Sequence, residues 1–206
     1  MQADGSLPEW DFEWDYTMGL PDSPTLSKTW YHYTSGTIAT NIVSDGLRLG
    51  NASIIGYNMY TSDAPHAIAV NGNGVIEAKM KVKRRASNAA GFGRLVLGTG
   101  VADVGVAIAF SAKSGTSGNI YLCDNSTFDL GTKIGTFSSD VFKVVRLVLE
   151  NNIGSVYLDG VKVKDNIDPT TIYVEASSAW GAFNFREAPT GHYATYEYVK
   201  VKSGRV

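Results

Sequence analysis

The chain has 206 residues, a mass of 22.1 kDa and a formal net charge of −2, from 18 basic and 20 acidic side chains. This length fits one domain, and the 44% of apolar residues can build a core, which excludes extensive disorder. The lack of a basic excess argues against a nucleic-acid-binding protein, and no apolar run reaches the roughly 18 residues of a membrane span. A single cysteine, Cys123, excludes an internal disulfide and a cysteine-rich zinc site.

The start of the chain lacks the basic segment and apolar segment of a signal peptide. We expect one domain over residues 1–206, with residues 1–8 as a flexible N-terminal segment. The sequence is typical of a domain cut from a longer polypeptide.

The segment from Glu9 to Tyr16 alternates acidic and aromatic residues without exception. Alternate residues of an extended chain point to opposite faces, so a strand here has four rings on one side and four carboxylates on the other. A helix would scatter both groups around its axis. We therefore predict a strand over this segment.

Clusters of Gly, Asn, Ser and Thr divide the rest of the chain into short runs with period-2 alternation, which is typical of β-strands. In 75–83, apolar residues alternate with charged ones, which predicts one buried face and one wet face. The best helix candidate is 64–70. The predicted strands are 30–34, 46–49, 57–62, 75–83, 93–97, 105–110, 119–123, 142–150, 155–158, 171–175, 179–185 and 193–202.

Turn residues support this assignment near the end of the chain. The Asp159-Gly160 pair, followed by a strand from Val161 to Val163, predicts a type I′ hairpin, since both central positions take positive φ. The segment 151–154 is predicted to form the preceding turn. About a dozen short strands in one domain indicate a sandwich or a barrel.

The C-terminal half carries a recognisable pattern, with a long strand at 142–150 followed by the hairpin Gly154–Val163 that contains V-Y-L-D-G. Together with strands 75–82 and 196–201, this pattern resembles the concanavalin A-like (lectin/glucanase, laminin-G-like) jelly-roll superfamily. The resemblance implies an all-β fold, a two-sheet antiparallel β-sandwich. Members of the superfamily include lectins, carbohydrate-binding modules, glycosidases, lyases and adhesion or tail-fibre modules, so the fold does not select the function.

Glu9, Asp11 and Glu13 match the E-x-D-x-E spacing of the laminarinase- and lichenase-type glycosidases of this superfamily. The resemblance implies a nucleophile, a tuning aspartate and an acid/base, in that order, since retaining hydrolysis needs two nearby carboxyl groups. However, this segment lies almost at the terminus, and Trp10 stands where the pattern has an aliphatic residue. The alternative is an edge strand with its acidic face in water.

Trp180 and Asn184 lie on one face of the predicted strand 179–185, and Arg186, directly after it, continues this face. Phe183 and Phe185 share the other face. A flat ring with an amide and a guanidinium suits a sugar, whose C–H face packs on an aromatic ring. We therefore predict a ligand site on these residues, with Tyr57 and Tyr60 as further contacts. The alternative is that Trp180 covers the core and that Arg186 pairs with a carboxylate.

Other polar residues give weaker signals. His32, His66 and His192 are isolated and fit no metal motif. The basic run from Lys79 to Arg85 predicts a solvated face, or else a contact with an acidic polysaccharide or partner. No cofactor is expected, although a structural Ca²⁺ ion could be held by oxygens of Asp4, Asp22, Asn71, Asn73, Asp165, Asn166 and Asp168, unless these residues only form turns.

The resemblance and the aromatic face together predict a non-catalytic, lectin-like module that binds an oligo- or polysaccharide, as part of a larger extracellular, cell-surface or virion-associated protein. Two alternatives remain open. One is a structural or interaction module, such as a phage tail-fibre or adhesin subunit. The other is a glycoside hydrolase or polysaccharide lyase that uses Glu9 and Glu13.

Overall fold

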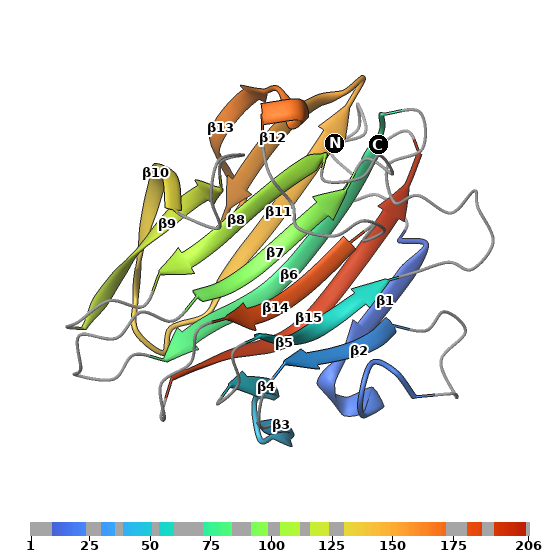
Figure 1. The fold of residues 1–206 in the computed structure, drawn as a ribbon, viewed down its shortest axis with the longest axis vertical. Helices are drawn as coiled ribbons and strands as arrows, with labels where there is room; N and C mark the ends of the chain where they lie inside the picture. The colour runs from blue at the N-terminus through green and yellow to red at the C-terminus, as the bar shows by residue number, and fades with distance from the viewer. Residues whose placement is uncertain are drawn as a thin grey trace.

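The computed structural model describes residues 10–23, 30–35, 39–50, 54–59, 72–83, 92–98, 104–111, 116–123, 130–171, 181–186 and 192–204. In these ranges the chain forms fifteen strands and two 3₁₀ turns, and it has no α-helix there. The strands make two antiparallel sheets that stack as two layers (Figure 1). The predicted two-sheet antiparallel β-sandwich is confirmed.

The first sheet has eight strands in the order β13-β12-β11-β6-β15-β4-β3, and β1 also pairs with β15. The β4 strand pairs with the first half of β15 and β1 with the second half, so both lie along one edge of β15. The bounds are β1 Phe12–Asp15, β3 Ala39–Val43, β4 Gly46–Gly50, β6 Gly74–Lys83, β11 Lys143–Glu150, β12 Ile153–Leu158, β13 Val161–Ile167 and β15 Tyr193–Ser203.

The second sheet has seven strands in the order β10-β9-β8-β7-β14-β5-β2. Its bounds are β2 Trp30–Ser35, β5 Ile54–Met59, β7 Phe92–Gly98, β8 Gly105–Ser111, β9 Ser117–Cys123, β10 Leu130–Ser138 and β14 Gly181–Arg186. The strands β3 and β10 were not predicted, because β10 contains two glycines and β3 contains Thr and Asn, which weaken the alternation.

Two predicted elements lie partly or wholly outside the described residues. The predicted strand 171–175 begins inside the 3₁₀ turn η2 (Pro169–Thr171), and the rest of it lies outside the described residues. The helix candidate 64–70 also lies outside them. The other 3₁₀ turn, η1 (Tyr16–Met18), directly follows β1.

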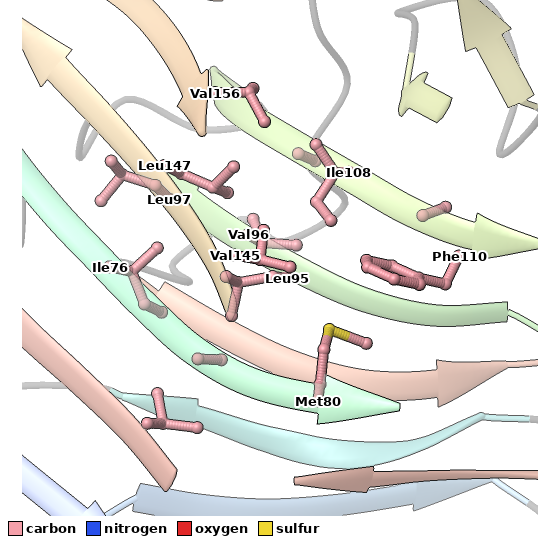
Figure 2. Packing of buried hydrophobic residues seen from close by; sticks show 14 of the residues in the cluster. Ile76, Met80, Leu95, Val96, Leu97, Ile108, Phe110, Val145, Leu147 and Val156 are labelled. Atoms are coloured by element: carbon pink, nitrogen blue, oxygen red, sulfur yellow. The ribbon is translucent and has the colours of Figure 1, made fainter. Parts of the chain in front are cut away.

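The core lies between the two sheets and is formed by the apolar half of each alternating strand. Ile76, Met80 and Leu147 of one sheet face Leu95 and Phe110 of the other, and all five are fully buried (Figure 2). Burial of a side chain of this size stabilises the fold by about 1.5–3 kcal/mol. The predicted core face of 75–83 is therefore confirmed.

The two sheets pack closely at Gly93 in β7. A Cβ atom at this position would lie 2.6 Å from Cγ2 of Val82 and 2.9 Å from Cε of Met80, both on β6 of the other sheet. Residue 93 therefore faces the core, and its missing side chain leaves the space that Val82 and Met80 fill.

The turns of the C-terminal half agree with the prediction. Asp159 and Gly160 have φ values of 49° and 80° and join β12 to β13, as a type I′ hairpin requires. Asn151 and Asn152, with φ values of 50° and 61°, make the turn between β11 and β12. Ile153 and the following residue already belong to β12, so this turn is shorter than predicted.

A register shift between Tyr196 and Tyr198 interrupts the alternation of β15. Tyr196 is fully buried in the core, and its hydroxyl donates a hydrogen bond to the Arg94 carbonyl of the other sheet at 2.8 Å. Tyr198 instead lies half-buried on the outer face, where its hydroxyl is 3.0 Å from Glu77 Oε1. The extra residue, Glu197, lies where the edge partner of β15 changes from β4 to β1.

Candidate functional site

The residues predicted to bind a ligand fall on two neighbouring strands of the seven-stranded sheet. Asn184 and Arg186 are on β14, and Tyr57 is on β5. In this pair Tyr57 stands opposite Phe183, and Asn184 stands opposite Gly56. Because Phe183 also pairs with the core residue Leu95, the register places Tyr57 on the core-facing side of the sheet and Asn184 on the outer side. Trp180 and Tyr60 lie outside the described residues, as do the side chains of β5 and β14, so the ligand contacts of all five residues stay a prediction.

The strand β7, on the other side of β14, adds an arginine that was not predicted as a site residue. Arg94 pairs with Asn184 on one side and with Ala109 of β8 on the other, and Ala109 in turn pairs with Tyr121 of β9. Since Gly93 faces the core, Arg94 lies on the outer side of the sheet. A charged residue inside the apolar run 92–98 is the signal that could have identified it.

Further polar groups lie near the cross-strand row formed by Asn184, Arg94, Ala109 and Tyr121. The Tyr121 hydroxyl accepts a hydrogen bond from Asn119 Nδ2 at 2.9 Å. Ser111, at the end of β8 and opposite Phe92, is only 1% exposed, and its Oγ has no hydrogen-bond partner in the described part of the chain. A buried hydroxyl without a partner costs free energy and is suited to hydrogen bond with a ligand or a water molecule.

The strands of this sheet contain no carboxylate. As described, none of the seven includes an Asp or Glu residue, whereas Arg94, Lys133 and Arg186 supply positive charge. Glycoside hydrolysis by the usual route needs two carboxyl groups at one site. These strands therefore hold no such pair.

The centre of this outer face is not open to solvent. Every residue of β7 and β8 is buried, including Arg94, Val96 and Ala109 on the outer side, and Arg94 is only 5% exposed. Of the two kinds of surface that binding could use, a sheet face or a rim of loops, this burial favours the rim.

The acidic and aromatic segment forms an edge strand, as the alternative interpretation predicted. Phe12 and Trp14 are buried in the core while Glu13 is exposed, so the alternation holds within β1. The prediction of four rings on one face is wrong at Trp10, while Tyr16, after the strand, packs partly buried against the core. The half-buried Trp10 precedes the strand and lies 5.8 Å from the guanidinium of Arg146 on the outer face, and the chain turns into η1 after β1.

The carboxylates proposed for catalysis hold β1 onto β15. Asp11 Oδ2 accepts hydrogen bonds from the Ser203 backbone N–H at 2.6 Å and from its hydroxyl at 2.7 Å. Glu13 Oε2 lies 3.2 Å from Lys200 Nζ. Glu9 lies outside the described residues. The catalytic role of this set stays a prediction, while the contacts of Asp11 and Glu13 show a structural role.

A pocket of about 320 Å³ opens where β1 ends and the bulge of β15 begins. Its walls combine aromatic rings, carboxylates, a hydroxyl and one ammonium group. The lining residues are Glu13, Trp14, Asp15, Tyr16, Thr17, Glu197, Tyr198 and Lys200.

Tyr198, which lines this pocket, belongs to a hydrogen-bonded cluster with Glu77 and Arg146. Arg146 donates to Glu77 Oε2 through Nε at 2.7 Å and through Nη2 at 2.6 Å, and the Tyr198 hydroxyl donates to the other oxygen. Burial and the negative charge of Glu77 raise the pKa of the Tyr198 phenol well above its usual value. Tyr198 therefore remains a neutral hydrogen-bond donor at ordinary pH.

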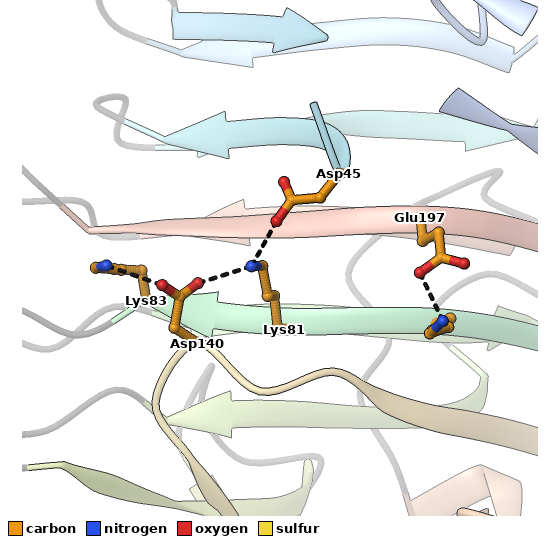
Figure 3. Close-up of polar contacts among 6 residues, drawn as sticks. Asp45, Lys81, Lys83, Asp140 and Glu197 are labelled. Atoms are coloured by element: carbon orange, nitrogen blue, oxygen red, sulfur yellow. Dashed lines mark hydrogen bonds and ion pairs between the residues drawn. The ribbon is translucent and has the colours of Figure 1, made fainter. Parts of the chain in front are cut away.

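The basic run on β6 is paired with carboxylates (Figure 3). Lys79 contacts Glu197 at 2.7 Å, Lys81 contacts Asp45 at 2.7 Å and Asp140 at 2.9 Å, and Lys83 contacts Asp140 at 2.8 Å. The expected wet face is wrong for Glu77 and Lys81, which are only 7% and 8% exposed. Both carboxylates and the ring of Phe142, whose centre lies 4.8 Å from Nζ, cover Lys81. Arg84 and Arg85 lie outside the described residues.

Asp140 is the centre of this ion-pair network. Burial alone would raise the pKa of its carboxyl, but hydrogen bonds from Lys83 and Lys81 outweigh that effect and lower it. The hydrogen bond to Asp140 raises the pKa of Lys83. For Lys81, burial lowers the pKa, but hydrogen bonds to Asp45 and Asp140 outweigh it and raise it.

No metal site emerges from the described residues, where no group of three or more His, Cys, Asp or Glu side chains is arranged to hold an ion. Two of the calcium candidates serve turns instead, since Asn73 Oδ1 accepts from the Asn151 N–H and Asp168 Oδ1 accepts from the Thr170 N–H. His192 is buried, and His66 lies outside the described residues. In the same ranges, no helix has the length and apolar character needed to cross a membrane.

The fold matches solved structures, although no family model and no curated protein matches the sequence. The transglycosylase Crh5 in complex with NAG has a TM-score of 0.60 and 13% identity, over 94% of this chain and 84% of that one. The Emp46p carbohydrate recognition domain, in its metal-free form, has a TM-score of 0.59 and 11% identity, over 95% of this chain and 98% of that one. The carbohydrate-binding module CBM66 from Bacillus subtilis has a TM-score of 0.51 and 16% identity, over 86% of this chain and 98% of that one.

The fold is of the concanavalin A-like jelly-roll type. The resemblance inferred from the strands of the C-terminal half is thus confirmed at the level of the fold. At these identities the likeness extends to architecture alone, and the function must be argued from the residues.

Proposed function

We propose that this chain is a non-catalytic glycan-binding module of a larger extracellular, cell-surface or virion-associated protein. The observation that carries the proposal is the position of Asn184 and Arg186 on the outer side of β14, with Arg186 at the end of the strand, in a sheet whose described strands contain no carboxylate. Amide, guanidinium and phenol groups suit the hydroxyls of a sugar, whereas hydrolysis would need a pair of acids. The binding and recognition domains among the structural neighbours support the glycan-binding part of the proposal.

The predicted contact residues complete this site. Trp180, which precedes β14, is proposed to supply the ring on which the sugar stacks, and Asn184 and Arg186 its polar contacts, with Tyr60 from the neighbouring segment. Stacking on one ring with a few hydrogen bonds gives weak binding, which several copies in a parent protein would strengthen.

Calorimetric titration with a panel of neutral, amino and uronic-acid oligosaccharides tests the proposal. We expect Trp180→Ala to weaken binding of the preferred glycan at least about tenfold, which corresponds to about 1.4 kcal/mol, without changing the melting temperature. Tyr157→Ala is the matched control, since it removes a partly exposed ring from β12 on the other sheet. Unchanged affinity in Trp180→Ala would remove the site assignment.

The same samples separate the alternatives. Failure to bind any glycan, together with a defined trimer in light scattering, would replace the proposal with the structural or interaction module. Release of reducing ends or of unsaturated products, abolished by Glu13→Gln, would replace it with an enzyme.

A further inference from the structure

The pocket beside β1 lies on the eight-stranded sheet, so it is separate from the residues of β14 proposed to bind a glycan. Three features of the fold create it. The β1 strand ends at Asp15, η1 turns the chain away, and the bulge at Glu197 breaks the edge of β15 between its partners β4 and β1. Its volume of about 320 Å³ is at the lower end of the range of about 300–1,000 Å³ for small-molecule sites, which fits a ligand of one ring.

The walls of the pocket favour a positive group. Two tyrosine rings, Tyr16 and Tyr198, line it together with the carboxylates of Glu13, Asp15 and Glu197. Lys200 in the wall and Lys79 on Glu197 offset two of these three negative charges. Aromatic faces and carboxylates both attract an ammonium group, the rings through their negative faces and the carboxylates through their charge.

Each carboxylate is only partly used by the protein. Thr17 occupies Oδ1 of Asp15, Lys200 occupies Oε2 of Glu13, and Lys79 occupies Oε2 of Glu197. Within the described residues, the second oxygen of each group has no other partner, so it can accept a hydrogen bond from water or a ligand. The Thr17 hydroxyl and the three acids can therefore hold an ammonium group and neighbouring hydroxyls together.

The protein's own lysine shows the preference of this wall. The Lys200 ammonium lies 5.2 Å from the centre of the Tyr198 ring and 3.2 Å from Glu13 Oε2, which is the ring-and-carboxylate contact that an external ammonium would make. Asp15 and Glu197 provide a second set of carboxylates in the same pocket.

We infer that this pocket binds a primary ammonium group on a hydroxylated ring, as in an amino sugar. The ammonium lies among Asp15, Glu197 and the tyrosine rings, and the ring hydroxyls contact Thr17 and the remaining carboxylate oxygens. An acetylated amine loses the charge, and a uronic acid adds a repelled one.

Titration of the chain with glucosamine, N-acetylglucosamine and glucuronate, followed by NMR, tests this inference. We expect glucosamine to bind at least about tenfold more tightly than the other two, and Glu197→Gln to weaken it about 3- to 10-fold, in line with one partly exposed charge contact. Glu150→Gln is the matched control, because Glu150 is an exposed acid of the same sheet that does not line the pocket. Melting temperatures confirm that each variant is folded.

Three outcomes would overturn the inference: equal affinity for glucosamine and N-acetylglucosamine, an unchanged affinity in Glu197→Gln, or loss of glucosamine binding in Trp180→Ala. The last outcome would assign the ligand to the other sheet. Because Trp180→Ala tests the glycan site and Glu197→Gln tests this pocket, the two proposals can fail independently.

Discussion

The two sheets of the sandwich share one core but differ in how they carry charge. Strands of the eight-stranded sheet include both acids and bases, and on its outer face Glu77, Lys79, Lys81 and Arg146 are joined in ion pairs. Strands of the seven-stranded sheet include no acid, and the central pair β7 and β8 is buried on both sides. On the eight-stranded sheet Glu77 and Lys81 are also buried, and ion pairs with Arg146 and with Asp45 and Asp140 compensate their charges.

The largest expected effect concerns the two tyrosines that the bulge of β15 sends to opposite sides. Tyr196→Ala removes a fully buried ring and its hydrogen bond to the other sheet, so we expect the free energy of unfolding to fall by about 3–5 kcal/mol. Tyr198→Ala removes a half-buried outer ring and should cost about 1 kcal/mol. Urea unfolding measures both, and equal costs would contradict the assignment of the two residues to different faces.

A smaller effect is expected at Gly93, where the two sheets pack closely. Gly93→Ala inserts a methyl group 2.6 Å from Val82 Cγ2, so β7 or β6 must shift, at a cost of about 1–3 kcal/mol. Thr136→Ala, at an exposed position of β10 in the same sheet, is the control and should change stability by less than about 0.5 kcal/mol. A stabilising Gly93→Ala would show that the sheets do not meet there.

The smallest effect concerns the ion pairs of the eight-stranded sheet. Because the pKa of Asp140 is lowered by folding, its stabilisation is present above about pH 4 and is lost as the pH falls through the lower folded-state pKa. Because the pKa values of Lys81 and Lys83 are raised, their contribution is present below about pH 10.5 and is lost as the pH rises through the folded-state values.

Asp140→Asn tests this contribution. We expect it to reduce stability at pH 7 by about 0.5–1 kcal/mol, since the pairs are partly exposed and screened, and to flatten the acid limb of the stability curve. Asp165→Asn, at an exposed position on β13, serves as the control. An unchanged acid limb in Asp140→Asn would mean that this network does not stabilise the fold.

The local sequence pattern was sufficient to predict much of the fold but little of the candidate sites. The alternation in 75–83 and the turn at Asp159-Gly160 predicted their structures, because both depend on neighbours in sequence. The place of Arg94 beside Asn184 depends on the register of strands far apart in the chain, and no local pattern encodes that register. The pocket beside β1 was missed for the same reason, since its two halves come from opposite ends of the sequence.

The sequence by itself determined that the chain forms short strands with one apolar face, because side-chain alternation requires only the extended backbone. It also determined the tight turns, because Asn, Asp and Gly accept positive φ. Only the tertiary structure decided which outer face is buried, since burial depends on what packs over a strand. The tertiary structure also decided where β15 reverses its alternation, because the bulge forms where its edge partner changes from β4 to β1.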